Sequence, residues 1–242
     1  MEFLLQQSKS EVEAILASAP SDIERISASL KSLFPHETLS GASAAFTSAL
    51  NISSVDNPGN KEVTDALFVV RDEISAAVAK IMAFERFIAL SNPPMEDGNN
   101  FGVTVQMMVA KYCKDTRESL EKIADGLPAY FDSRAGAYEK MPSVPSKTSS
   151  SSTSTSSSSG GKDGDEEKKS TSSSTEEKAS GSTSADRSNH VVAIDVNFYF
   201  KLNTALKTIL DSYAVVIDNV TKNFDKLAAP KGTSGSNSMS MF

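Results

Sequence analysis

Cysteine, histidine and tryptophan are scarce in this 242-residue sequence, which has one Cys, two His and no Trp. The single thiol, Cys113, cannot form a disulfide within the chain, which suits a reducing compartment such as the cytoplasm or the nucleus. The two histidines are His36 and His190, and no Cys-x-x-Cys or His-x-x-x-His pair is present. We therefore expect no metal site.

Long apolar runs and excess positive charge are lacking too. No run reaches the roughly 18–20 residues that a membrane span needs, and the N-terminus has no basic segment of the kind that opens a signal peptide. The net charge of −7 argues against nucleic acid as the main partner, because phosphate binding requires a basic surface. No glycine-rich phosphate loop occurs, so no nucleotide cofactor is expected.

What the sequence does contain is apolar residues at alternating spacings of three and four, which indicates helices. The pattern predicts four of them, at residues 8–33, 61–90, 101–138 and 191–227. Pro20 predicts a kink or a restart in the first, and Gly126 with Pro128 marks a weak point near the end of the third. Residues 36–60 are predicted to be a connector.

Three of these helices carry a clear apolar stripe. The stripe of the second helix consists of Val63, Leu67, Val70, Ile74, Val78 and Ile81, followed by Phe84 and Phe87. The third is expected to turn inward Val105, Met108, Val109, Tyr112, Leu120, Ile123 and Leu127. The fourth has Leu202, Leu206, Ile209, Tyr213, Val216, Val220, Phe224 and Leu227. Long striped helices bury their stripes best against one another, so we predict an all-α, elongated, antiparallel four-helix bundle.

A serine-rich tract and a short apolar terminus complete the chain. Residues 147–188 contain no aromatic and no large aliphatic side chain, so nothing there offsets the entropy lost on ordering. We predict one domain over residues 1–242, with a disordered insertion at 143–189 and a flexible tail at 230–242. A helix of about 35 residues is about 50 Å long, and the lateral surface of four such rods favours self-association.

The turn PPMEDGNNFGVTVQ, at residues 93–106, has no generic explanation between two helices. Glu96 and Asp97 fit either a helix cap that answers the helix dipole or a metal or acid/base pair. No nucleophile or histidine accompanies them, and a lone cysteine within a helix is typical of packing. We expect a protein that is not an enzyme, with a hydrolase as a distant alternative.

Three segments together resemble the 11S, or REG, family of proteasome activators. EDGNNFGVTVQ, at residues 96–106, is similar to the activation loop of that family. YAVVIDNVTKNFDKLAAPKG, at 213–232, resembles its last helix, and LKSLFP, at 30–35, resembles the close of its first helix. The three matches occur in the family's order, and a chain with this pattern is identified as a member.

The resemblance implies a homoheptameric ring of four-helix subunits, assembled side by side, that caps the 20S proteasome without ATP. An activation loop would move the gate formed by the proteasome α-subunits, with Asp97 and Asn99 making the decisive contacts. The C-terminal tail would insert between neighbouring α-subunits. The implied loop residues are Met95, Glu96, Asp97, Gly98, Asn99, Asn100, Phe101 and Gly102. The implied tail residues are Met239, Ser240, Met241 and Phe242.

One departure from the family concerns its charged insertion, which in animal members often lies between the first two helices. Here the low-complexity tract lies between the third and fourth helices, at the end of the bundle away from the loop. It would guard the channel entrance, recruit partners or serve only as solvated filler. The alternative function is an oligomeric helical scaffold that opens no gate. In either case we expect no membrane or nucleic-acid partner, and a cytoplasmic or nuclear location.

Overall fold

The structure is a computed structural model that describes residues 2–50, 59–94, 100–140 and 181–231, with side chains from residue 185 onward in the last range. Its helices are α1 (Glu2–Leu33), α2 (Leu39–Ala49), α3 (Lys61–Leu90), α4 (Phe101–Gly126), α5 (Ala129–Glu139) and α6 (Gly181–Ala228). No strand occurs in the described ranges, which confirms the all-α class. Nor does any helix among these residues combine the length and apolarity that a bilayer crossing requires.

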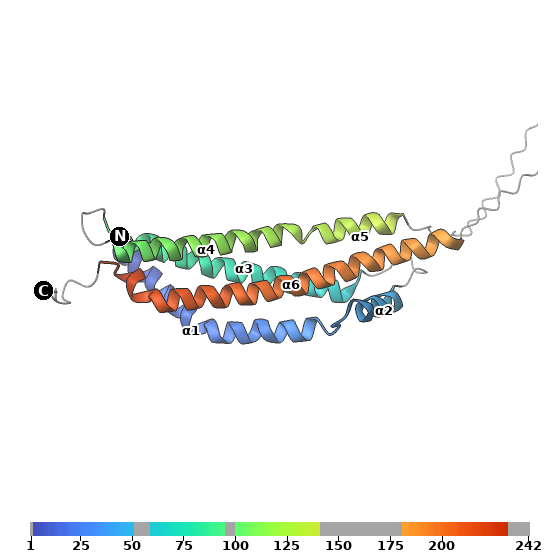
Figure 1. The fold of residues 1–242 in the computed structure, drawn as a ribbon, viewed down its shortest axis with the longest axis horizontal. Coiled ribbons are helices and arrows are strands. Elements are labelled where there is room, and N and C mark those ends of the chain that lie inside the picture. Colours follow the sequence, from blue (N-terminus) through green and yellow to red (C-terminus); the bar gives the residue numbers. More distant parts are fainter. Residues whose placement is uncertain (1, 51–58, 95–99, 141–180, 232–242) are drawn as a thin grey trace, which may run out of the picture.

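Four helices, α1, α3, α4 and α6, lie along one another and make the molecule elongated (Figure 1). Ion pairs at the two ends show that α1 and α3 are antiparallel. Arg86, near the end of α3, pairs with Glu11, near the start of α1. At the other end, His36 after α1 lies 3.2 Å from Glu62 in the first turn of α3. The predicted antiparallel course is therefore present between these two neighbours.

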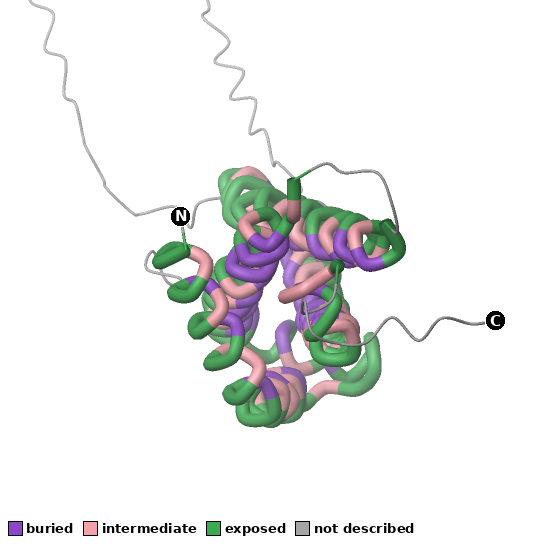
Figure 2. Tube along the Cα trace, turned by 90° about the vertical axis from the view of Figure 1, so that its left-hand side faces the viewer, coloured by how far each residue is buried: buried purple, intermediate pink, exposed green. Residues whose placement is uncertain are grey.

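The predicted stripes of α3 and α6 form the centre of the core. All their members are buried apart from Val78 and Phe224, which are half-buried. Figure 2 shows buried residues facing the space between the helices and exposed residues facing outward. Full burial of one large aliphatic side chain stabilises the fold by about 1.5–3 kcal/mol, so these two stripes dominate the packing. α3 also has the predicted bounds, and Asn60 caps it by accepting a hydrogen bond from the Val63 amide at 3.3 Å.

The apolar face expected for α4 is partly wrong. Met108 is 68% exposed and Tyr112 is 38% exposed, although both were expected to point inward. The buried face of α4 instead consists of Gly102, Gln106, Val109, Cys113, Thr116 and Leu120. These positions recur every three or four residues, as a helical face does, but half of them are small or polar. A prediction from apolar residues alone therefore placed the buried face of α4 too far round the helix, toward Met108 and Tyr112.

α1 runs without interruption through Pro20, so the kink expected there does not become a restart. Figure 1 shows that α1 changes direction along its length. Proline removes one amide donor and leaves a carbonyl in the preceding turn unpaired. Serine hydroxyls add bonds on either side: Ser18 donates to the Ile15 carbonyl at 3.1 Å, and Ser21 donates to the Ser18 carbonyl at 2.7 Å.

Two segment boundaries need correction. The predicted connector at 36–60 contains α2, which Thr38 caps by accepting from the Gly41 amide at 3.1 Å. α6 begins at Gly181, so disorder predicted for residues 181–189 is wrong, while the rest of the insertion, 143–180, lies outside the described residues. The packed part of α6 begins at Val191, and the helix continues from there toward its N-terminus. Adding a turn to an existing helix allows this because it avoids the cost of nucleation.

The third predicted helix is divided at its weak point. α4 ends at Gly126 and α5 begins at Ala129, with Pro128 between them. The Tyr130 amide donates to the Leu127 carbonyl at 3.2 Å, which keeps the two helices in line across the break. α5 then packs along α6 and continues the course of α4 toward the far end of the molecule (Figure 1).

Candidate functional site

The ends of three helices meet at one end of the molecule. α3 ends at Leu90, α4 begins at Phe101 and α6 ends at Ala228, all at the end where α1 begins (Figure 1). Of the predicted activation loop, Asn100, Phe101 and Gly102 are described, whereas Met95 to Asn99 lie outside the described residues. The predicted tail residues, Met239 to Phe242, also lie outside them. The site must therefore be built from the segments that lead into the loop and the tail.

Asn100 and Thr104 define how α4 starts. Asn100 is the N-cap residue, and its carbonyl accepts from the Thr104 amide at 2.9 Å and from the Thr104 hydroxyl at 3.2 Å. Its side chain makes no capping hydrogen bond. The N-cap position itself belongs to Asn100, and Glu96 and Asp97, predicted as a cap or an acid pair, lie outside the described residues.

We call residues 226–231 the tail root, because they carry the chain from α6 toward the predicted tail. Lys226 places its ammonium group 4.7 Å from the ring centroid of Phe101, a cation–π contact. Lys231 donates to the Pro94 carbonyl at 3.3 Å. The tail root therefore contacts the residue just before the predicted loop and one residue in its last part, and Met95 to Asn99 between them lie outside the described residues.

Gly102 is where α4 lies against the tail root most tightly. A Cβ atom at this position would lie 2.6 Å from the carbonyl carbon and 2.7 Å from the Cα of Pro230, and closer still to the Pro230 oxygen. No real side chain tolerates such separations from backbone atoms. Glycine often serves where the backbone adopts angles closed to other residues, but at Gly102 the structure indicates a different need, the close approach of two backbones.

Gln106 joins the ends of three helices. It is 2% exposed, and its Nε2 donates to the Leu227 carbonyl at 2.8 Å and to the Ser91 carbonyl at 3.3 Å. Helices leave their last carbonyls without an intrahelical partner, and buried carbonyls need one. One amide from α4 thus satisfies carbonyls at the ends of both α3 and α6. Sequence reasoning missed this residue, and the only available signal was an amide on the buried face of a helix.

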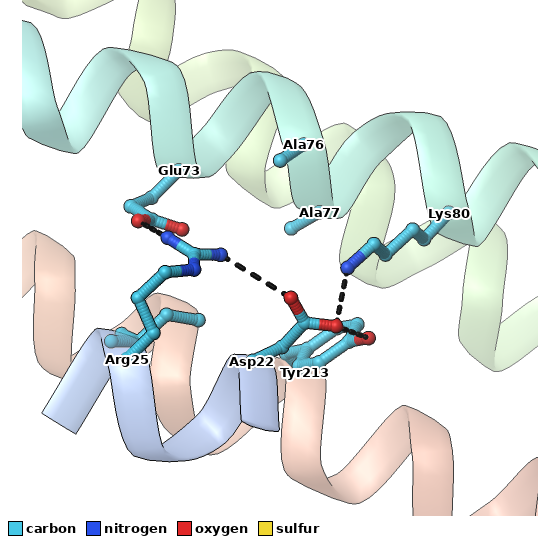
Figure 3. A pocket seen from close by; sticks show the side chains of 8 residues that line it. Asp22, Arg25, Glu73, Ala76, Ala77, Lys80 and Tyr213 are labelled. Atoms are coloured by element: carbon cyan, nitrogen blue, oxygen red, sulfur yellow. Dashed lines mark hydrogen bonds and ion pairs between the residues drawn. The ribbon is translucent and has the colours of Figure 1, made fainter. Parts of the chain in front are cut away.

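Two other polar clusters lie farther along the helices. Asp22, Arg25, Glu73, Lys80 and Tyr213 form a network between α1, α3 and α6 (Figure 3). Burial raises the pKa of the Asp22 carboxyl, but the hydrogen bonds and charges of Lys80 and Arg25 outweigh it and hold that pKa below its usual value. The adjoining cavity of about 10 Å³ has room for no more than about one water molecule, so this network serves to join helices.

The second cluster surrounds Asp195, which is 2% exposed. Its carboxylate accepts from the Tyr130 hydroxyl and from Arg134 Nε, both at 3.0 Å, and from Asn60 Nδ2 at 3.3 Å. Burial raises the pKa of this carboxyl above its ordinary value, although the charge of Arg134 acts against that rise. The cluster ties α5 and the start of α3 to α6.

Cys113 is fully buried in the core. Burial, together with the nearby charge of Glu85, raises the pKa of this thiol to about 12, which keeps it in the unreactive protonated form. The described residues hold no group of three His, Cys, Asp or Glu side chains arranged for a metal ion. The contacts described above form a junction of helix termini at one end of the molecule.

Comparisons with known proteins point to one family. The family model for "Proteasome activator PA28, C-terminal" matches residues 56–147. Proteasome activator complex subunit 3 of Homo sapiens is 20% identical over 174 residues, and the protein of the same name from Gallus gallus matches equally. These matches cover 72% of this chain and 54% of each relative, so the chain spans about half the length of the curated relatives it matches.

Solved structures share the fold at low sequence identity. The 11S subunit of the Plasmodium falciparum proteasome, PA28, superposes with a TM-score of 0.60 at 18% identity, covering 96% of this chain and 92% of that one. The activator in an archaeal 20S proteasome–PA26 complex gives a TM-score of 0.62 at 16% identity, with 99% of both chains covered. At such identities these likenesses establish the fold.

Fold and site together define an all-helical protein in which the segments that lead into the predicted loop and the predicted tail meet at one end. The two sequence matches are more specific. The family-model match over residues 56–147 and the curated relatives support the 11S, or PA28, family of proteasome activators, which the loop and last helix of the sequence resemble.

Proposed function

We propose that the protein is an ATP-independent activator of the 20S proteasome. It binds the α-subunit end of the proteasome through its C-terminal tails and opens the gate through the loop at residues 95–102. One observation carries the proposal. Pro94, just before that loop, and Phe101, in its last part, both contact the tail root, so the described ends of the loop lie beside the segment that leads into the tail. A single partner surface can then meet both.

The proposed assembly is a homoheptameric ring of four-helix subunits. Exposed apolar side chains on the flanks of the molecule support side-by-side association: Met107 and Met108 on α4 are each 68% exposed, and Met82 on α3 is 52% exposed. Contacts between copies would remove these side chains from water. A ring also explains how short tails bind. Several tails on one rigid body raise the effective concentration, so avidity can exceed single-tail affinity by a factor of about 10² to 10⁴.

The two segments have different proposed roles. Tails supply affinity, and loops supply a contact that is available only when the gate is open, which shifts the gate equilibrium. Asp97 and Asn99 make the decisive loop contacts, and the free carboxylate of Phe242 meets a lysine between neighbouring α-subunits. The protein works in the cytoplasm or nucleus, and neither a nucleotide nor a metal takes part. The Ser-rich tract joins α5 and α6 at the far end of the molecule, where it would lie away from the proteasome.

Two variants test this division of roles in a peptidase assay with latent 20S proteasome. Asn99→Tyr should bind the proteasome and compete with the wild-type ring, yet fail to stimulate hydrolysis. Deletion of Met239 to Phe242 should abolish binding, so that this variant does not compete. If both variants lost activity through the same step, the proposed division would be wrong. Binding without stimulation by the wild-type ring would support an oligomeric scaffold instead.

A further inference from the structure

We propose that the tail root is the positioning element of the activation loop, with Gly102, Gln106 and Pro230 as the residues that hold the two together. This inference rests on the proposed function and deepens it. It states that docking of the tail also sets where the loop stands, because both are fixed to one rigid junction of helix ends.

The tail root contacts the chain at both ends of the loop. Lys231 donates to the Pro94 carbonyl just before the loop, and Lys226 covers the ring of Phe101, in the last part of the loop. Gly102, one residue further, lies directly on the Pro230 backbone. A short loop moves little when both of its ends are held by one neighbouring segment.

The junction of helix ends around Gln106, next to these contacts, is buried and specific. Gln106 is 2% exposed and bonds carbonyls of two other segments, at Ser91 and Leu227. Loss of a bond at such a position leaves a buried polar group without a partner, which helix ends avoid. The junction therefore favours one arrangement of α3, α4 and α6. Because the end of α6 is fixed in that arrangement, the position of Pro230 just beyond it is fixed too.

The contact between the tail root and Gly102 can also transmit displacement from the tail to the loop. A contact surface that must displace part of another protein has to be held within about 0.5 Å of its working position. A tail that binds between α-subunits pulls on the tail root. Because the tail root lies against Gly102, that pull acts at the first turn of α4, next to Asn99 in the sequence. A direct backbone contact transmits displacement, whereas long flexible side chains would absorb it.

The decisive variant is Gly102→Ala, with Gly136→Ala as its matched control. Alanine is a better helix former than glycine, so neither change harms its helix. At Gly136 in α5 the added methyl meets nothing within 4 Å, whereas at Gly102 it must push Pro230 away. Gln106→Met is the second variant, since it keeps the length of the side chain and removes the amide.

Two readouts separate positioning from binding and from folding. In the peptidase assay, Gly102→Ala and Gln106→Met should lower the maximal stimulation about tenfold, while the activator concentration for half-maximal stimulation changes less than about twofold. Gly136→Ala should match the wild type in both. Unchanged maximal stimulation would overturn the inference. So would a loss confined to the half-maximal concentration, because the tail root would then act through affinity alone.

Amide hydrogen exchange on the free oligomer keeps the inference testable without the proteasome. Gly102→Ala should speed exchange in the first turn of α4 by about tenfold, because its restraint is gone, and Gly136→Ala should not. Equal exchange in both variants would refute the coupling. If the wild type bound no proteasome but this difference were found, the proposed function would fail while the coupling stood. Lys226→Met, exposed and outside the buried junction, should show a smaller loss of maximal stimulation even if Gln106→Met misassembles.

Discussion

Arg134 neutralises the buried carboxylate of Asp195, and the structure allows the loss of stability on its replacement to be worked out. Arg134 is on α5, and its Nε lies 3.0 Å from the carboxylate of Asp195 on α6. Its side chain is 13% exposed. Asp195 is 2% exposed and borders a cavity of about 220 Å³ that Arg134 also lines, so water can replace only part of the lost charge. Breaking a buried pair by removing one partner costs about 3–5 kcal/mol. The hydrogen bonds from Tyr130 and Asn60 remain, so we expect Arg134→Met to lower the free energy of unfolding by about 3 kcal/mol, the lower end of that range.

Two further variants accompany Arg134→Met, and all are measured by urea unfolding at one fixed protein concentration because assembly adds to apparent stability. The double variant Asp195→Asn/Arg134→Met has no buried charge and should recover to within about 1–2 kcal/mol of the wild type. Arg71→Met is the matched control. Its side chain is 60% exposed and its ion pair is long, so its loss should stay below about 0.5 kcal/mol.

The stability loss of Arg134→Met should depend on pH, in a direction that follows from the pKa of Asp195. Burial already raises the pKa of Asp195, and removal of Arg134 raises it further by deleting the charge that opposed the rise. A carboxyl whose pKa is higher in the folded state is most favourable to folding when protonated, and that contribution is lost as pH rises through the folded pKa. The deficit of Arg134→Met should therefore be full at neutral pH and shrink on acidification toward the ordinary value of 3.8. A deficit equal to that of Arg71→Met, or one independent of pH, would refute the reasoning.

Further predictions concern the thiol and the flanks of α4. Cys113 has a pKa of about 12 in the core, so a thiol reagent should label it only after denaturation; fast labelling of the folded oligomer would contradict its burial. Met108→Glu places a charge on an exposed apolar flank and should lower the native mass toward that of a monomer while leaving helix content unchanged. An intact oligomer in that variant would exclude this flank from the interface.

The helical core could be predicted from the sequence because its signal is local and periodic. The spacing of apolar residues from Val63 to Phe87 set the bounds of α3, and the stripe from Leu202 to Leu227 set the packed face of α6. Gly126 and Pro128 marked the break between α4 and α5, since each disfavours a helix interior. Propensity and pattern agreed at these places.

What could not be predicted depends on contacts between distant residues. Gln106 and Leu227 are 121 positions apart, and Asp195 meets Tyr130 from 65 positions away. Polar residues at such sites carry no apolar signal, which is also why the buried face of α4 was assigned to Met108 rather than to Gln106. α2 was missed because Ala and Ser dominate its 11 residues and leave only a weak stripe. The loop and tail residues themselves remain predictions.

A single titration decides whether the chain opens the gate of the 20S proteasome, as we propose. The purified oligomer, with its mass verified, is added in increasing amounts to latent 20S proteasome and a short fluorogenic peptide in the absence of ATP. We expect a saturable rise in the rate of hydrolysis. A flat rate over the same titration, with the oligomer shown to sediment together with the proteasome, would contradict it.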